Sequence, residues 1–154
     1  MKVLVTGANG FVGKNLVSTL ENIRDCKDRS TKVGSDLEIF CYDIDTDKAL
    51  LQTYCEQADF VFNLAGVNRP KDEKEFMEGN FGFASSLLES LKKHNNKCPV
   101  MISSSIQATL IGRYANSDYG KSKLAGEELM LEYGKETGAR VLVYRFPNLF
   151  GKWC

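Results

Sequence analysis

The chain has 154 residues, in which 20 Lys and Arg balance 20 Asp and Glu. This balance gives no net field toward nucleic acid or an anionic membrane, so neither is expected as a partner. The apolar runs are far shorter than the roughly 20 residues that cross a bilayer, and the opening segment lacks the basic start and cleavage site of a secretory signal. We therefore expect one cytoplasmic domain with a core of ordinary size.

The cysteines are widely spaced and form no C-x-x-C pair. They predict neither a disulfide framework nor a zinc clip, and we interpret them as small buried hydrophobic residues. His94 is the only histidine, so no metal site is expected, and a histidine-based triad would have to be built on that residue. The cysteines are Cys26, Cys41, Cys55, Cys98 and Cys154.

Short apolar runs typical of buried strands alternate with stretches of helical spacing along the whole chain. A polar stretch, Lys27–Asp36, is typical of a loop. The alternation predicts an α/β fold, a Rossmann-type doubly wound parallel sheet of five strands with helices on both faces. In the usual strand order the first and fourth strands lie side by side, and their carboxyl ends frame the ligand crevice. In chain order the expected elements are strand Val3–Val5, helix Phe11–Leu20, strand Ile39–Tyr42, helix Ala49–Cys55, strand Phe60–Phe62, helix Glu73–Lys93, strand Val100–Ile102, helix Tyr119–Thr137 and strand Val141–Tyr144.

A glycine-rich turn joins the first expected strand to the first helix. Gly7 suits a tight turn, Gly10 lets the backbone approach a pyrophosphate, and Gly13 lets the helix pack closely against the strand. The helix N-terminus offers N–H groups and a partial positive charge to phosphates. This placement predicts a dinucleotide site, with a purely structural turn as the alternative. The residues expected at the cofactor are Gly7, Asn9, Gly10, Phe11, Val12 and Gly13.

The G-x-x-G-x-x-G spacing of this turn resembles the short-chain dehydrogenase/reductase superfamily. In that family an acidic residue closing the second strand holds the adenine ribose, and Asp43 stands at this place, with Asp45 close behind. A carboxylate there favours NAD(H), because it repels a 2′-phosphate. A solvated loop carboxylate is the alternative. After the third strand, Leu64, Ala65 and Gly66 resemble the family segment whose small residues let the backbone lie against the cofactor.

Tyr119 is the only one of six tyrosines with a lysine four residues later, Lys123. On a helix this spacing places both groups on one face. A free phenol has a pKa of about 10, and a neighbouring ammonium is expected to lower the pKa of Tyr119, so that it exchanges a proton with a carbonyl. Ser103-Ser104-Ser105 ends the fourth strand, where a hydroxyl can hydrogen-bond a developing oxyanion. The family pattern favours Ser105 as this residue, with Ser104 second, and implies that Lys123 also holds the nicotinamide ribose. A strand that merely ends in hydroxyls, beside an ordinary amphipathic helix, is the alternative.

The segment Arg145–Gly151 follows the fifth strand and resembles the R-x-x-N-x-x-G segment of extended family members that act on nucleotide sugars. The resemblance places Pro147 and Asn148 beside the nicotinamide. In related dehydratases an Asp-Glu pair follows the catalytic hydroxyl, whereas Ile106 and Gln107 stand there in this chain. Dehydration is therefore disfavoured.

Three stretches together resemble the N-terminal reductase domain of the CapF family of capsular polysaccharide synthesis enzymes. The resemblance implies NADP(H)-dependent reduction of a UDP-linked 4-keto-6-deoxy amino sugar. It also implies that residues 1–154 are the NAD(P)-binding domain of a longer enzyme, without its C-terminal substrate-binding part and its cupin domain. The stretches are Leu64–Pro70, Ser103–Thr109 and Pro147–Cys154.

Two other functions stay open. A nucleotide-sugar 4-epimerase would, by family resemblance, use the same three residues with a tightly bound cofactor. A chain without half of the pocket wall would instead be an inactive dinucleotide-binding module, because catalysis requires a closely held substrate. The cofactor is NADP(H) by resemblance and NAD(H) by the argument from Asp43. An open sheet edge after Tyr144 predicts a homo-oligomer.

Overall fold

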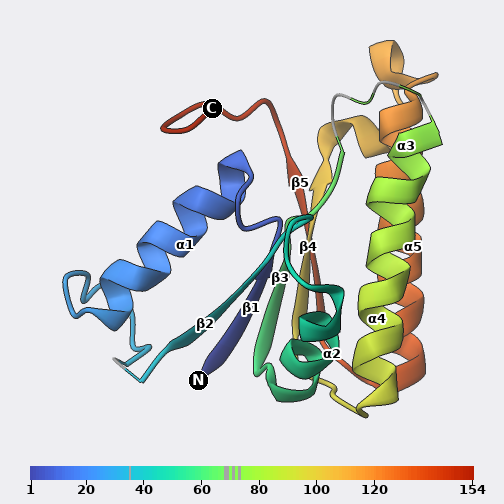
Figure 1. Ribbon diagram of the computed structural model, residues 1–154. Coiled ribbons are helices and arrows are strands. Elements are labelled where there is room, and N and C mark those ends of the chain that lie inside the picture. The colour runs from blue at the N-terminus through green and yellow to red at the C-terminus, as the bar shows by residue number, and fades with distance from the viewer. Residues whose placement is uncertain (35, 68–69, 71, 73) are drawn as a thin grey trace.

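A computed structural model describes residues 1–34, 36–67, 70, 72 and 74–154 of the chain (Figure 1). Asn68 and Arg69, which belong to the first CapF-like stretch, lie outside the described residues. So does Glu73, the first residue of an expected helix. Over the described residues, strands and helices follow one another in the expected order.

The described residues form a five-stranded parallel sheet in the order β2-β1-β3-β4-β5, which confirms the expected Rossmann-type architecture. The expected pairing of the first strand with the fourth is wrong, because β1 lies between β2 and β3. In the usual order, the second and third strands both lie on one side of the first strand, and the fourth lies on its other side. Here only β2 lies on the first side of β1, and β3 already lies on the other. The change in winding direction therefore falls between β1 and β3, and a crevice is expected at their carboxyl ends. The strands are β1 (Lys2–Thr6), β2 (Glu38–Tyr42), β3 (Phe60–Asn63), β4 (Val100–Ser105) and β5 (Val141–Phe146).

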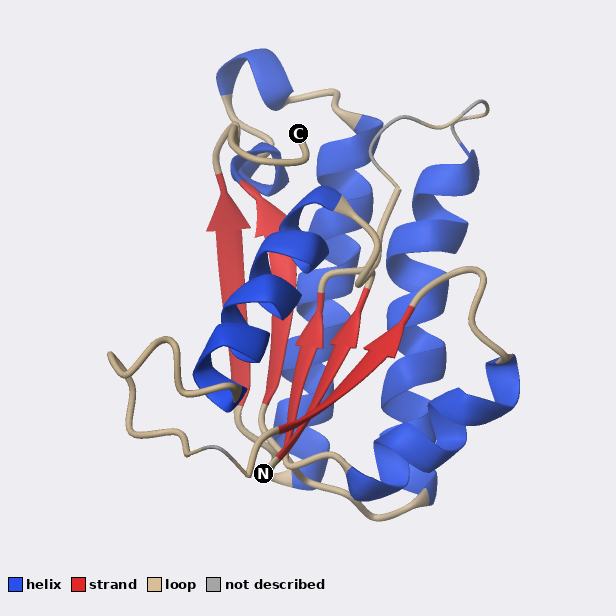
Figure 2. Cartoon of the chain, turned by 60° about the vertical axis from the view of Figure 1, so that its left-hand side comes forward, coloured by secondary structure: helices blue, strands red, loops and turns tan. Residues whose placement is uncertain are grey.

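Helices cover both faces of this sheet, but unequally. In the part of the chain that the structure describes, one face carries α1 alone and the other carries α2, α4 and α5 (Figures 1 and 2). Neighbouring residues of β1 divide between two cores, since Val3 and Val5 pack on the α1 side and Leu4 on the other. Among the described residues, no helix combines the length and the apolar character needed to cross a membrane. The helices are α1 (Phe11–Arg24), α2 (Lys48–Gln57), α3 (Lys74–Phe76), the π-helical η1 (Met77–Gly82), α4 (Phe83–Lys93), the 3-10 helices η2 (Ile106–Thr109) and η3 (Gly112–Tyr114), and α5 (Asp118–Thr137).

Two boundaries differ from expectation in ways that affect the site. The helix expected over residues 73–93 contains a π-helical segment, η1, in which Asn80 is buried. β4 does not end at Ile102 but continues to Ser105, because it stays paired with β5 as far as Phe146. The serines expected to end the strand therefore have strand geometry, with successive side chains on opposite faces of the sheet.

The expectation that all cysteines are buried is wrong. Cys55 and Cys98 lie in the core, but Cys26, Cys41 and Cys154 are exposed. Cys41 sits on the edge strand β2 between two buried residues, and the alternation of a strand turns it outward. Cys26 and Cys154 lie outside helices and strands, where no apolar layer covers them.

Candidate functional site

The glycine turn is held by contacts that leave no room for side chains. Gly7 has φ +67°, a left-handed conformation, and a Cβ there would lie 2.7 Å from the backbone nitrogen of Ala65. A Cβ on Gly13 would lie 2.8 Å from the Cα of Ala8 and still closer to the Gly7 carbonyl oxygen. Gly10 is less restricted, with 3.2 Å from its ideal Cβ to that same oxygen. The turn is thus packed against both its own helix and the segment that follows β3.

The N-terminus of α1 is open. Its N-cap, Gly10, supplies no side-chain hydrogen bond, and the first turn of α1 carries no acidic residue. By contrast, Asp47 caps α2 and Ser117 caps α5 through side-chain oxygens. The first N–H groups of α1 and the partial positive charge at its N-terminus therefore face the edge of the sheet, and no capping side chain occupies them. An anion site requires this arrangement.

Asp43 follows β2 and lies beside the glycine turn. Its carboxylate accepts hydrogen bonds from the Asn9 backbone N–H at 2.7 Å and from the Ile44 N–H at 2.8 Å. The Asn9 side chain donates to Asp45 at 3.2 Å. These bonds fix a carboxylate next to the turn, where the sequence places the ribose contact.

A buried polar cluster joins the β3 loop to α5, and sequence reasoning missed its central residue. The Oδ1 of Asn80 accepts from the Val67 N–H at 2.9 Å, and its Nδ2 donates to the Val67 carbonyl at 3.0 Å and to the Ser122 hydroxyl at 2.9 Å. A Cβ on Gly66 would lie 2.5 Å from Asn80 Oδ1 and 3.0 Å from Lys123 Nζ. The only sign of Asn80 in the sequence is its position between Phe76 and Phe83 on the apolar face of the expected helix, where a polar side chain needs a hydrogen-bond partner.

Tyr119, Lys123 and Ser105 come together at the carboxyl end of β4. Lys123 is buried, its Nζ donates to the Ser103 carbonyl at 3.2 Å, and it lies 5.7 Å from the centre of the Tyr119 ring. The Ser105 side chain lies near enough to the Tyr119 hydroxyl to lower the pKa of that hydroxyl. Ser104 points to the other face of the sheet, where its hydroxyl donates to Glu127. Ser105, and not Ser104, is therefore the serine whose side chain lies near the Tyr119 hydroxyl.

The tail after β5 returns to α1. Pro147 and Asn148 are exposed, and the following residues lie against α1, where Asn15 donates from Nδ2 to the Lys152 carbonyl at 2.8 Å. An ideal Cβ on Gly151 would lie 3.7 Å from the Phe11 ring, so the tail sits beside the first turn of α1. Among the described residues, neither Pro147 nor Asn148 makes a hydrogen bond or ring contact with Tyr119 or Lys123.

Comparison with known proteins identifies the family. The sequence pattern described as "NAD dependent epimerase/dehydratase family" matches residues 3–153. The chain belongs to the NAD-dependent epimerase/dehydratase family.

The chain is similar over almost its whole length to several known proteins. It is 38% identical over 153 residues to the UDP-2-acetamido-2,6-beta-L-arabino-hexul-4-ose reductase of Pseudomonas aeruginosa, covering 99% of this chain and 37% of that protein. The crystal structure of the capsular polysaccharide assembling protein CapF from Staphylococcus aureus is 43% identical, with a TM-score of 0.77, covering 100% of this chain and 37% of that one. The enzyme WbmF of Bordetella bronchiseptica, solved in complex with NAD+, is 26% identical with a TM-score of 0.71, covering 97% and 50%. The resemblance to CapF inferred from sequence is confirmed, and this chain spans 37% of the length of the first two proteins.

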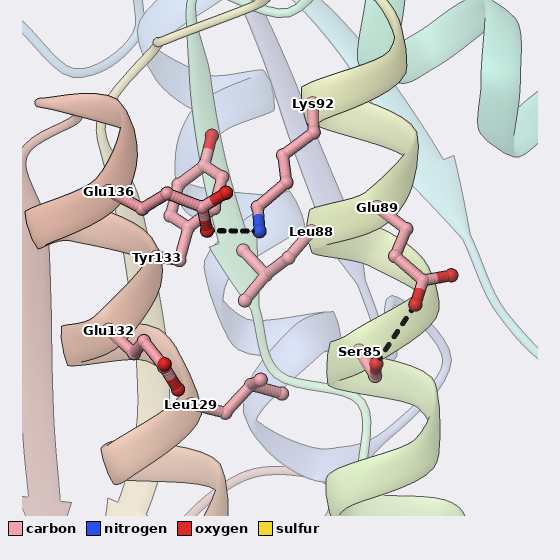
Figure 3. A pocket seen from close by; sticks show the side chains of 8 residues that line it. All are labelled: Ser85, Leu88, Glu89, Lys92, Leu129, Glu132, Tyr133 and Glu136. Atoms are coloured by element: carbon pink, nitrogen blue, oxygen red, sulfur yellow. Dashed lines mark hydrogen bonds and ion pairs between the residues drawn. The ribbon is translucent and has the colours of Figure 1, made fainter.

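A second groove lies between α4 and α5, but its charges do not suit a dinucleotide (Figure 3). Glu89, Glu132 and Glu136 line it, against a single lysine, Lys92, which is paired with Glu136. The excess of carboxylates would repel phosphates. The residues that line the groove are Ser85, Leu88, Glu89, Lys92, Leu129, Glu132, Tyr133 and Glu136.

The protonation of the two helix residues departs from the sequence argument. Burial raises the pKa of Tyr119, and the nearby Ser105 hydroxyl only partly offsets this, so the expected lowering by Lys123 is wrong. Burial instead lowers the pKa of Lys123 to about 8. The sequence argument counted the ammonium but not the loss of water around both groups.

The variant Lys123→Met tests this buried charge, because it keeps most of the side-chain volume. Since burial lowers the pKa of Lys123 from 10.5 to about 8, the unfolded chain holds this proton more tightly and the ammonium destabilises the fold below pH 8. At about 1.4 kcal/mol per pKa unit, we expect Lys123→Met to raise the free energy of unfolding at pH 7 by about 3 to 4 kcal/mol. This gain in the free energy of unfolding should shrink as the pH rises from 8 toward 10.5, because over this range Lys123 of the wild type is neutral in the folded chain but still charged in the unfolded chain.

Urea unfolding at pH 7 and pH 10 measures both effects. The control is Lys121→Met, which removes an exposed lysine two residues away on the same helix. A Lys123→Met effect that is no larger than that of the control, or that does not change with pH, would contradict the buried-ammonium account.

Proposed function

We propose that the chain binds a pyridine dinucleotide along the carboxyl edge of its sheet and belongs to a reductase of UDP-linked 4-keto-6-deoxy amino sugars in capsular polysaccharide synthesis. One observation carries the proposal: the glycine turn, the β3 loop and the Tyr119–Lys123–Ser105 cluster form one series of contacts. Gly7 packs on Ala65, and Gly66 packs on Lys123. A phosphate site and a proton donor are therefore held at opposite ends of the same edge. The identity to the Pseudomonas aeruginosa reductase supports the choice of substrate class.

The residues present fit a dinucleotide in this position. The open N-terminus of α1 with the turn Gly7–Gly13 would hold the pyrophosphate, Asp43 the adenine ribose and Lys123 the nicotinamide ribose. Leu64, Ala65 and Gly66 would lie along it. The small side chains of Ala65 and Gly66 let the backbone approach, and the Leu64 side chain packs on the core instead. A reduced nicotinamide supplies the hydride when it is bound.

The protein's own residues supply the proton and the orientation. A phenol is protonated at neutral pH, and burial raises the pKa of Tyr119 further, so Tyr119 can donate a proton from Oη to the carbonyl oxygen as that oxygen gains negative charge. Ser105 would hydrogen-bond the same oxygen, and the Gln107 N–H, which donates to Ser105 Oγ at 3.2 Å, orients it. Lys123 is charged below a pH of about 8 and stabilises the phenolate left on Tyr119.

The direct test is to titrate NADH and NADPH against the chain while assaying reduction of a UDP-linked 4-keto sugar. We expect Tyr119→Phe to lower any reduction by about 100-fold or more with no change in dinucleotide affinity, because only the proton donor is lost. Tyr54→Phe, on α2 and away from this edge, is the control and should change neither. Binding without reduction would leave the chain an inactive dinucleotide-binding module. Dinucleotide that copurifies and is not exchanged during turnover would favour an epimerase, and binding of neither nucleotide would contradict the site itself.

The cofactor preference depends on Asp43. Its carboxylate is fixed beside the turn by the Asn9 N–H, so we propose that NADH binds more tightly than NADPH, by about 10-fold or more, because a 2′-phosphate would face a negative charge. Asp43→Asn should bring the two affinities together, whereas Asp45→Asn, which removes the neighbouring exposed carboxylate, should leave their ratio unchanged. Calorimetric titration of each variant gives this ratio. A wild-type preference for NADPH would contradict the role of Asp43.

A homo-oligomer and a cytoplasmic location stay predictions. The first is supported by β5, which pairs with β4 alone among the described strands and leaves Tyr144 half exposed. An open strand edge with an exposed aromatic residue favours association.

A further inference from the structure

Glu127 joins α5 to two strands at once. Its side chain is buried, with 4% of the residue exposed, yet it carries a charge. The Arg145 guanidinium on β5 donates to both carboxylate oxygens, from Nε at 2.8 Å and from Nη2 at 2.6 Å. The Ser104 hydroxyl on β4 donates to the same carboxylate. Of these residues, sequence reasoning singled out Arg145, in a family segment, and Ser104, as a second candidate hydroxyl, but it did not predict that they bind Glu127.

The positions of these three residues connect them to the proposed site. Tyr119, Lys123 and Glu127 are spaced by four residues on α5, so they follow one another along a single face of the helix. Ser104 directly precedes Ser105, and its side chain points to the opposite side of the sheet. One carboxylate thus contacts the strand that carries Ser105 while standing one helical turn from Lys123.

The cluster holds its charges in place. Although burial acts to raise it, hydrogen bonds from Arg145 and Ser104 bring the pKa of Glu127 below its ordinary value, so the carboxylate is ionised at neutral pH. Two parallel hydrogen bonds between a guanidinium and a carboxylate fix direction as well as distance. The Arg145 side chain is 42% exposed, so water screens the pair on that side and the pair adds little net stability. Its value here lies in the arrangement that it imposes.

We propose that Glu127 is a positioning residue, which through Ser104 and Arg145 fixes α5 relative to β4 and β5 and so sets Lys123 and Tyr119 against the nicotinamide half of a bound dinucleotide. The inference rests on the proposed function. It implies a division of the site into two halves. The adenine half depends on the glycine turn and Asp43, whose described contacts do not involve α5, and the nicotinamide half depends on the Glu127 cluster.

Binding measurements separate the two halves without requiring turnover. The affinities of ADP, which occupies only the adenine half, and of NADH are measured by calorimetry for wild type, Glu127→Gln and Glu128→Gln. We expect Glu127→Gln to weaken NADH binding about 10-fold and to change ADP binding less than about 2-fold. Glu128→Gln removes the neighbouring exposed carboxylate and should change neither. A general loosening of the fold would weaken both ligands alike, so the ratio of the two affinities distinguishes positioning from stability.

The second variant is Ser104→Ala, which removes only the β4 contact and carries the same test if Glu127→Gln does not fold. Ser104→Ala should weaken NADH binding about 3-fold and leave ADP binding unchanged. Equal losses for both ligands, or unchanged NADH binding in both variants, would overturn the inference while leaving the proposed function standing. Wild-type protein that binds neither ligand would overturn the proposed function and this inference with it.

Discussion

Backbone packed directly on backbone at the carboxyl edge of the sheet is the constraint on which the rest of the site depends. Gly7, Gly13 and Gly66 sit where a Cβ would meet main-chain or buried polar atoms. Because these residues carry no side chains, the first helix, the loop after β3 and the side of α5 approach one another closely. Larger residues at these places would separate the open helix N-terminus from the tyrosine and lysine.

The same edge concentrates buried polar groups. Lys123, Asn80 and Glu127 each occupy a place that an apolar residue could fill, and each makes a hydrogen bond to a neighbouring element. Among the described residues, no fully buried side-chain nitrogen or oxygen lacks a partner. Burial of charge costs stability, as the lowered pKa of Lys123 indicates. A fold that keeps such groups at one edge holds them in defined positions rather than gaining stability from them.

The order of strands and helices could be predicted from the sequence because it depends on local patterns of apolar residues. The glycine turn and the Tyr119–Lys123 pair could be predicted for a similar reason, since their chemistry lies within a few adjacent positions. Strand order could not, because Val3–Val5 and Phe60–Phe62 give no sign of which strand lies next to which. Asn80 and Glu127 were missed because their partners, Val67 and Arg145, are distant in sequence. The direction of the Tyr119 pKa was wrong because a sequence shows charge but not burial.

The central claim is that one edge of the sheet holds both halves of a dinucleotide, and amide chemical shifts of the 15N-labelled chain during an NADH titration test it most directly. The account predicts that the amides of Gly10 and Gly13, at the turn, and those of Gly66 and Ser105, toward α5, shift together with a single dissociation constant. Shifts confined to the α4–α5 groove, around Glu89 and Glu132, would contradict it. So would shifts at the turn with none at Ser105, since the phosphate site and the proton donor would then not share a ligand.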